Sequence, residues 1–160
     1  MTTGYFAEET NLAALRAECA AWKGTPFAAH SAIIGAGGDC VRTAAAIYQA
    51  VGAIGPIDWP RYRIHGEEAE YLLARMDACP GLVRTASESG ANPNPGDCLV
   101  GKAKDGVLHI AIHEGEGFIW HMSRRLGWCR RHVQVARRAW ELVAVYRPAG
   151  ACQGGAQYAG

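Results

Sequence analysis

Asn92-Pro93-Asn94-Pro95-Gly96-Asp97 divides this chain of 160 residues into two parts of different character. Such a segment predicts a turn, because proline fixes φ and asparagine and aspartate bond their own backbone. We expect Asp97 to brace this turn. Before the turn, apolar residues recur at helical spacing, and after it they alternate with polar residues as in strands. Helices followed by an antiparallel sheet predict an α+β domain, with the N-terminal helices packed on the C-terminal sheet.

The pattern predicts three helices and five strands. The helices are expected at residues 8–22, 40–51 and 67–78, and the strands at 98–103, 107–113, 117–122, 128–135 and 139–147. Thr10 or Asn11 can cap the first helix, and Gly52 ends the second. Residues 27–39 and 53–65 are expected to be irregular chain. We expect residues 1–148 to form one domain and the Gly/Ala-rich residues 149–160 to be a frayed tail.

The second predicted helix begins at a glycine-rich loop that ends on a thiol, Gly37-Gly38-Asp39-Cys40. A helix N-terminus offers unpaired N–H groups and the positive end of the macrodipole, which favour a thiolate. Asp39 is expected to cap the helix, and the glycines leave room for a ligand. We therefore expect Cys40 at an exposed helix tip. A lone cysteine is more often a small buried apolar residue, so the prediction of a nucleophile needs a base as well.

Two histidines supply the expected base and its orienting group. His109 and His121 are symmetric about residue 115, so regular pairing of their strands would place them opposite each other on one face. His109 would then act as the base for Cys40, with His121 holding its tautomer. His113 is the second choice as base. Trp120 should point to the opposite face, into the core.

Composition limits the other classes of function. Sixteen basic and fifteen acidic residues give a net charge of +1, which does not favour nucleic acid as a partner. A local cluster of arginines is read as a solvated face, with an anionic polymer site as the alternative. It comprises Arg124, Arg125, Arg130, Arg131, Arg137 and Arg138. The six cysteines are scattered, which indicates neither a metal site nor a disulfide framework.

No apolar run approaches the roughly 20 residues that span a membrane. The segment Met1-Thr2-Thr3-Gly4-Tyr5 lacks the features of a signal peptide. We therefore expect synthesis in the cytoplasm without signal-dependent export.

Five short motifs, in order over residues 10–147, resemble the NlpC-type (NlpC/P60) cell-wall cysteine peptidases, particularly their phage-tail branch. The motifs are Trp22-Lys23-Gly24-Thr25-Pro26-Phe27, Gly38-Asp39-Cys40, Pro95-Gly96-Asp97, His109-Ile110-Ala111-Ile112 and Ile119-Trp120-His121.

The resemblance implies a papain-like fold and a triad of Cys40, His109 and His121. It implies cleavage of peptidoglycan stem peptides next to D-glutamate through a thioester, without a cofactor or metal. The backbone N–H of Cys40 would help hold the oxyanion, and Asp39, Phe27 and Gly38 would line the substrate or oxyanion site. Phage tail proteins and a place in the virion are further implications of the resemblance.

Two departures from the family pattern keep other functions open. Val41-Arg42 follows the cysteine where the family has a small residue and glycine, and Phe27 stands where tyrosine is common. One alternative is therefore a structural or cell-wall-binding component of a phage tail that has lost turnover. Another is a toxin-type amidase or acyltransferase on the same scaffold, since a thioester can pass its acyl group to water or to an amine.

Overall fold

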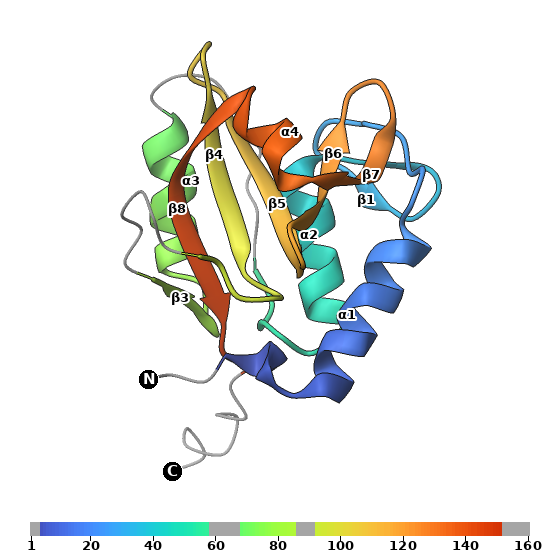
Figure 1. Cartoon of the computed structure of the whole chain (residues 1–160), viewed down its shortest axis with the longest axis vertical. Coiled ribbons are helices and arrows are strands. Elements are labelled where there is room, and N and C mark those ends of the chain that lie inside the picture. The colour runs from blue at the N-terminus through green and yellow to red at the C-terminus, as the bar shows by residue number, and fades with distance from the viewer. Residues whose placement is uncertain (1–3, 58–67, 86–91, 152–160) are drawn as a thin grey trace.

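The computed structural model describes residues 4–57, 68–85 and 92–151 (Figure 1). Its helices are η1 (Tyr5–Ala7), α1 (Glu9–Ala21), α2 (Cys40–Ala50), α3 (Glu68–Asp77) and α4 (Val133–Arg137). Its strands are β1 (Ala32–Ile33), β2 (Gly37–Gly38), β3 (Leu82–Arg84), β4 (Cys98–Ala103), β5 (Leu108–Gly115), β6 (Phe118–Ser123), β7 (Gly127–His132) and β8 (Trp140–Pro148).

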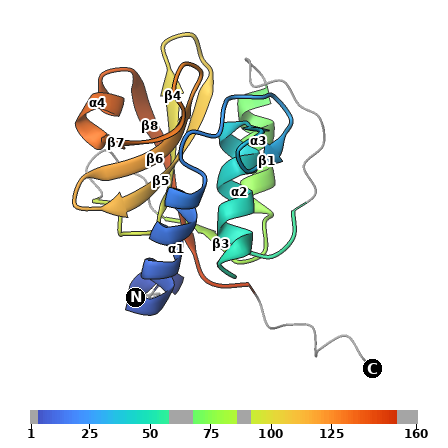
Figure 2. The same cartoon turned by 90° about the vertical axis from the view of Figure 1, so that its right-hand side faces the viewer.

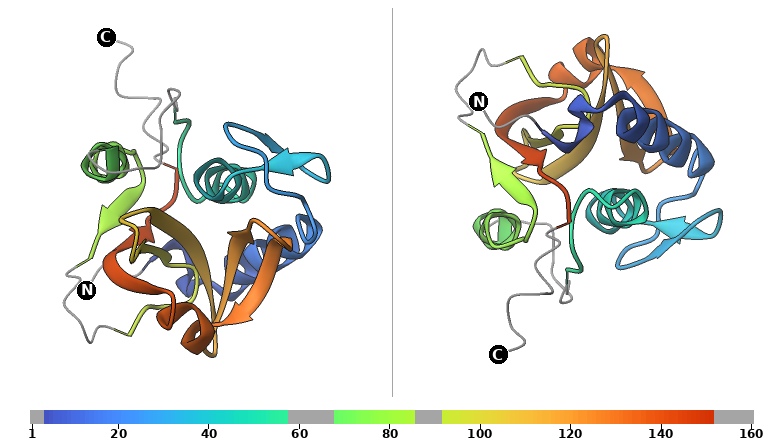
Figure 3. Two further views of the ribbon diagram at one scale, coloured as in Figure 1. Left: turned by 90° about the horizontal axis from the view of Figure 1, so that it is seen from above. Right: turned by 90° about the horizontal axis from the view of Figure 1, so that it is seen from below.

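Six strands form one antiparallel sheet in the order β3-β8-β4-β5-β6-β7. The helices α1, α2 and α3 cover one face of this sheet, and α4 lies on the opposite side (Figures 2 and 3). The predicted α+β architecture, with helices first and an antiparallel sheet second, is confirmed. Within the described residues, no helix has the length and apolar character needed to cross a membrane.

Strand β5 shows how the alternating pattern divides the core. Leu108, Ile110 and Ile112 belong to the main core, together with residues of α1 and α2. Ala111 belongs to a smaller core on the other face, which includes Ala136 of α4. Since successive side chains of a strand point to opposite faces, His109 lies on the face away from α2. The strand therefore presents His109 on one face and Leu108, Ile110 and Ile112 on the other.

The turn that separates the two parts of the chain is held by Asp97, as predicted. Its Oδ2 accepts the N–H of Asn94 at 2.8 Å. The same carboxylate forms a two-pronged ion pair with Arg147 at 3.0 and 2.9 Å, and it is only 1% exposed. His113 adds to the turn, because its Nδ1 lies 3.0 Å from the carbonyl oxygen of Asn94. His113 therefore has a structural role in the turn and is not placed to act as the base for Cys40.

Several local predictions were wrong. Helix α1 starts at Glu9, with Glu8 as its N-cap and no side-chain cap, because the amide of Asn11 donates to the Tyr5 carbonyl instead. The expected loop at 27–39 contains the short β1–β2 hairpin, with Ala32 opposite Gly38. Strand β3 was not foreseen. The strand expected at 128–135 ends at His132, whose side chain caps α4.

The chain after β8 departs from the expected frayed tail. The N–H groups of Ala149, Gly150 and Ala151 donate to the carbonyls of Gly81, Ala53 and Gly52. Backbone pairing therefore ties these three residues to the ends of α2 and α3. The rest of the predicted tail, residues 152–160, lies outside the described residues, as do residues 58–65 of the predicted irregular segment.

Candidate active site

Asp39 fixes the start of α2, as the sequence predicts. Its Oδ1 accepts the N–H of Arg42 at 2.7 Å, and its Oδ2 accepts the N–H of His30 at 2.9 Å. The carboxylate is 2% exposed, and burial raises its pKa. Asp39 therefore joins the preceding loop to the helix and sets the position of Cys40, the first residue of α2.

The thiol of Cys40 is buried, with the residue only 7% exposed, so the expected exposed tip is wrong. Burial raises the pKa of the thiol to about 11. The charge of Asp39 also raises this pKa. Hydrogen bonds from the backbone N–H groups of Ile110, Val41 and Cys40 lower it, but by less than burial raises it. The N–H groups at the start of α2 favour the thiolate as expected, but the cost of removing a charged thiolate from water is larger, so the pKa rises.

The thiol of Cys40 lies beside β5 at the end where β5 and β6 are no longer paired. The ladder between β5 and β6 stops at the Ala111–His121 pair, although β6 continues to Ser123. The N–H of His113 donates to the Asp97 carbonyl on the β4 side, so alternation turns the N–H of Ile110 toward β6. Within the described residues the β6 ladder does not extend to Ile110, and the N–H of Ile110 lowers the pKa of the Cys40 thiol. The sulfur is thus placed beside the backbone of the residue that follows His109.

His109 lies on the far face of β5, against Trp140 of β8. The two ring centroids are 6.1 Å apart. Gly101 of β4 lies opposite His109 in the ladder, and a Cβ on Gly101 would overlap the indole of Trp140. Burial lowers the pKa of His109, with Asp105 raising it and Arg124 lowering it further. Among the described residues, no hydrogen bond joins the imidazole of His109 to the Cys40 thiol.

His121 shares the face of His109 but does not lie opposite it. The register shifts between His113 and Gly115, so His121 pairs with Ala111. This bulge makes the two histidines diagonal neighbours, and the prediction of direct opposition was wrong. Burial lowers the pKa of His121 to about 4, and the charges of Arg131 and His109 lower it as well. Trp120 is 3% exposed in the main core, as predicted.

Of three residues beside the predicted triad, Cys129 and Trp140 were not singled out from the sequence, and Arg124 was named only as a member of the arginine cluster. Cys129 of β7 pairs with His121, and its Sγ lies 3.7 Å from His121 Nε2. Trp140 shields His109. Arg124 lies over the ring of Phe27, with Cζ 5.4 Å from the ring centroid. Their sequence positions carry a weak signal: the contact of Cys129 depends on the register of the β6–β7 hairpin, and those of Trp140 and Arg124 depend on segments more distant in the sequence.

The loop that precedes Cys40 is closely packed. Gly38 is bridged to Phe27, and a Cβ on Gly38 would overlap the hydroxyl of Thr43. The space that the sequence assigns to a ligand at this glycine is therefore occupied by Thr43. Phe27 itself is 36% exposed.

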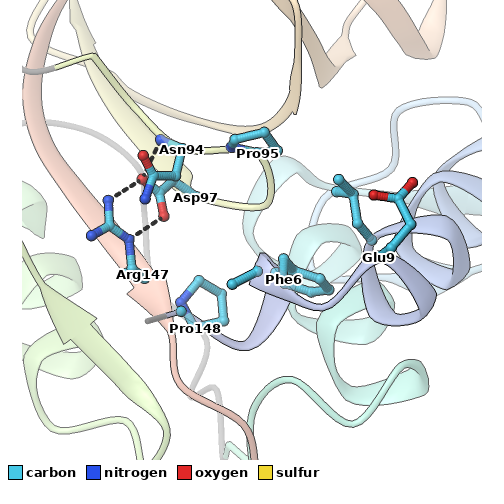
Figure 4. A pocket seen from close by; sticks show the side chains of 10 residues that line it. Phe6, Glu9, Asn94, Pro95, Asp97, Arg147 and Pro148 are labelled. Carbon is cyan, nitrogen blue, oxygen red and sulfur yellow. Dashed lines mark hydrogen bonds and ion pairs between the residues drawn. The ribbon is translucent and has the colours of Figure 1, made fainter. Parts of the chain in front are cut away.

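A pocket of about 250 Å³ lies elsewhere, between η1, the 94–97 turn and the end of β8 (Figure 4). Phe6, Pro95 and Pro148 line it beside the Asp97–Arg147 ion pair. It contains none of the predicted site residues. Within residues 4–57, 68–85 and 92–151, no group of three or more His, Cys, Asp or Glu side chains is placed to hold a metal ion.

No protein-family model matches the sequence, and no curated protein matches it. Solved structures do resemble the fold. One is a protein similar to a lipoprotein, of the NLP/P60 family, from Staphylococcus aureus subsp. aureus Mu50, with 16% identity over 92% of this chain and a TM-score of 0.58. The chain spans 43% of the length of that protein.

Another is the NlpC/p60 domain of the peptidoglycan hydrolase SagA, with 23% identity, a TM-score of 0.53, and coverage of 84% of this chain and 97% of that domain. At these identities the likeness shows the papain-like fold.

Proposed function

We propose that this chain is a cysteine peptidase of the NlpC/P60 type that hydrolyses peptidoglycan stem peptides. The observation that carries the proposal is the junction of α2 with the open end of β5, where the Cys40 thiol meets the backbone beside His109. Support comes from the fold, which resembles the NlpC/p60 domain of a peptidoglycan hydrolase. The sequence resemblance supports cleavage next to D-glutamate, and it is the sole support for a phage-tail setting with tail proteins as partners.

The proposed chemistry proceeds through a thioester. His109 lies on the other face of β5 from the helix that carries Cys40, so this chemistry requires its imidazole to turn past the open end of the β5–β6 ladder toward Sγ. As Cys40 Sγ bonds to the peptide carbonyl carbon, the thiol proton passes to that imidazole, and backbone N–H groups hold the oxyanion. The imidazolium then gives that proton to the leaving amine as the C–N bond breaks. Water attacks the thioester, which frees the acid and restores the thiol. His121 is assigned the orienting role.

The charge states of Cys40, His109 and His121 in the free protein determine the step at which the thiol proton is transferred. With the pKa of the thiol raised to about 11 and that of both imidazoles lowered, all three groups are neutral at pH 7. These shifts disfavour a thiolate–imidazolium pair in the free protein. The proton reaches His109 during attack on the carbonyl, when substrate is bound.

The proposal is tested by digestion of purified muropeptides, with products identified by mass spectrometry. Wild-type protein is expected to release hydrolysed stem peptides, and Cys40→Ala to lose at least about a thousandfold in rate. Cys79→Ala is the matched control, because Cys79 is also buried, at 6% exposed, and lies outside the site. Equal turnover in wild type and Cys40→Ala would overturn the proposal. Products joined to an added amine would identify an acyltransferase.

One observation favours a second candidate, a cell-wall-binding module without turnover. The neutral buried thiol of Cys40 has no hydrogen bond to His109 among the described residues, as expected if the triad were not assembled. This candidate predicts that wild-type protein binds muropeptides and leaves them intact.

A further inference from the structure

Arg124 and Phe27 form an exposed cation–π contact near the start of α2. Arg124 is an exposed residue in the turn between β6 and β7. Its guanidinium carbon lies 5.4 Å from the centre of the Phe27 ring. An arginine held over a ring face keeps its N–H edges available for a planar anion.

Backbone contacts tie this pair to the Cys40 loop. Phe27 is bridged to Gly38, two positions before Cys40. The N–H of Gly38 donates to the Pro26 carbonyl at 3.0 Å, and the N–H of Ala28 donates to the Gly38 carbonyl at 2.9 Å. The backbone at Phe27 is therefore held beside the strand that leads into α2.

The other side of the pair is tied to β7. The N–H of Gly24 donates to the Trp128 carbonyl, and the N–H of Trp128 donates to the Thr25 carbonyl, both at 2.9 Å. A Cβ on Gly127 would overlap the Thr25 carbonyl, so the two segments are in close contact. The turn that carries Arg124 is thus held against the segment that carries Phe27.

Arg124 has no carboxylate partner among the residues that the structure describes. By contrast, Arg130 is paired with Glu114, and Arg147 with Asp97. The positive charge of Arg124 reaches His109, whose pKa it lowers. Asp105 acts on His109 in the opposite sense, while its own Oδ1 accepts the N–H of Val107. An unpaired guanidinium thus lies within electrostatic range of the proposed base.

We propose that Arg124, supported by Phe27, binds a free carboxylate of the peptide next to the bond that Cys40 attacks. The inference rests on the proposed function and names its substrate class, an acidic peptide. A guanidinium donates two parallel N–H bonds to the two oxygens of a carboxylate, a geometry that a carboxamide cannot match. Phenylalanine suits this role, because its ring supports the guanidinium without a hydroxyl to compete for the anion.

The test compares two stem peptides, one with the free α-carboxylate of D-glutamate and one with a carboxamide there. Arg124→Gln is expected to raise KM about tenfold or more for the carboxylate peptide and to leave KM for the carboxamide peptide unchanged, while any change in kcat that comes through the pKa of His109 is common to both peptides. Arg125→Gln is the matched control, because Arg125 is the exposed neighbour in the same turn. Phe27→Leu should show part of the same KM effect. An equal change in KM on both peptides, or none, would overturn the inference.

Binding measured without turnover separates this inference from the peptidase proposal. In Cys40→Ala, calorimetric titration should give a Kd for the carboxylate peptide that rises about tenfold when Arg124→Gln is added. If wild-type protein cleaves neither peptide and this binding difference remains, the carboxylate site stands and the peptidase proposal fails. If cleavage occurs and the Kd does not depend on Arg124, the peptidase proposal stands and the carboxylate site fails.

Discussion

The Sγ of Cys129 lies 3.7 Å from the Nε2 of His121, directly across the β6–β7 ladder. A thiol that donates to Nε2 holds the proton of a neutral imidazole on Nδ1. Cys129 therefore has the position of a residue that sets the tautomer of His121, which is itself the proposed orienting group for His109.

Replacement of Cys129 tests this contact. Cys129→Ala is expected to lower kcat by about two- to tenfold, because a neutral hydrogen bond contributes roughly 0.5–1.5 kcal/mol. Cys129→Ser keeps a donor and should recover most of the rate. Steady-state hydrolysis of muropeptides by the three proteins gives the comparison. Identical kcat in the alanine and serine variants would show that the contact has no positioning role.

Gly101 leaves space for Trp140 to lie beside His109. A Cβ at position 101 would overlap the indole, so Gly101→Ala is expected to cost about 1–3 kcal/mol of unfolding free energy and to lower kcat. Gly55→Ala is the control, because its Cβ would meet Pro80 at an ordinary 3.8 Å. Urea unfolding and turnover report the two effects. A Gly101→Ala protein as stable and active as wild type would rule out this packing.

The low pKa of His121 predicts acid sensitivity. Burial, followed by the charges of Arg131 and His109, lowers this pKa from 6.5 to about 4. Between these pH values the unfolded chain binds a proton that the folded chain does not, so folded stability falls as pH falls. The loss from His121 is roughly 3 kcal/mol.

Urea unfolding of wild type and His121→Asn at pH 7 and pH 4.5 measures this contribution. The wild type should lose more stability on acidification than the variant, which lacks the titrating group. The same loss in both proteins would contradict the assignment.

The Asp97–Arg147 pair stabilises the junction of the two parts of the chain. Asp97 is 1% exposed, so Arg147→Met would leave a buried carboxylate without its cation. We expect a loss of about 3–5 kcal/mol. Arg84→Met is the control, because the Arg84–Asp77 pair is exposed, and it should cost less than about 1 kcal/mol. Chemical denaturation would refute the prediction if the two variants lost equal stability.

Much of the fold could be predicted from the sequence because its signals are local. The turn at Asn92–Asp97, the helical spacing before it and the alternation after it determine α1, α2, α3 and five strands within a few residues. Strand β3 and helix α4 lack such a signal. The three residues of β3 are a strand only because they pair with β8, and α4 is a single short turn capped by His132.

The candidate site was predicted less completely, for a physical reason in each case. The capping role of Asp39 is confirmed, because a cap depends on neighbouring residues alone. The burial of Cys40 depends on how α2 packs on β5, and the diagonal placement of His121 depends on one bulge. Arg124 lies over Phe27, which is distant in the sequence, and the pairing of Cys129 with His121 depends on the exact register of the β6–β7 hairpin, so periodicity alone could not place them.

The formation of a thioester on Cys40 is the most direct test of the peptidase proposal. A muropeptide digestion is quenched in acid, and the peptide that contains Cys40 is analysed by mass spectrometry. We expect an acyl adduct on Cys40 that hydroxylamine removes and that is absent from His109→Ala. Continued hydrolysis with no adduct on Cys40, and at the same rate in Cys40→Ala, would contradict the peptidase proposal.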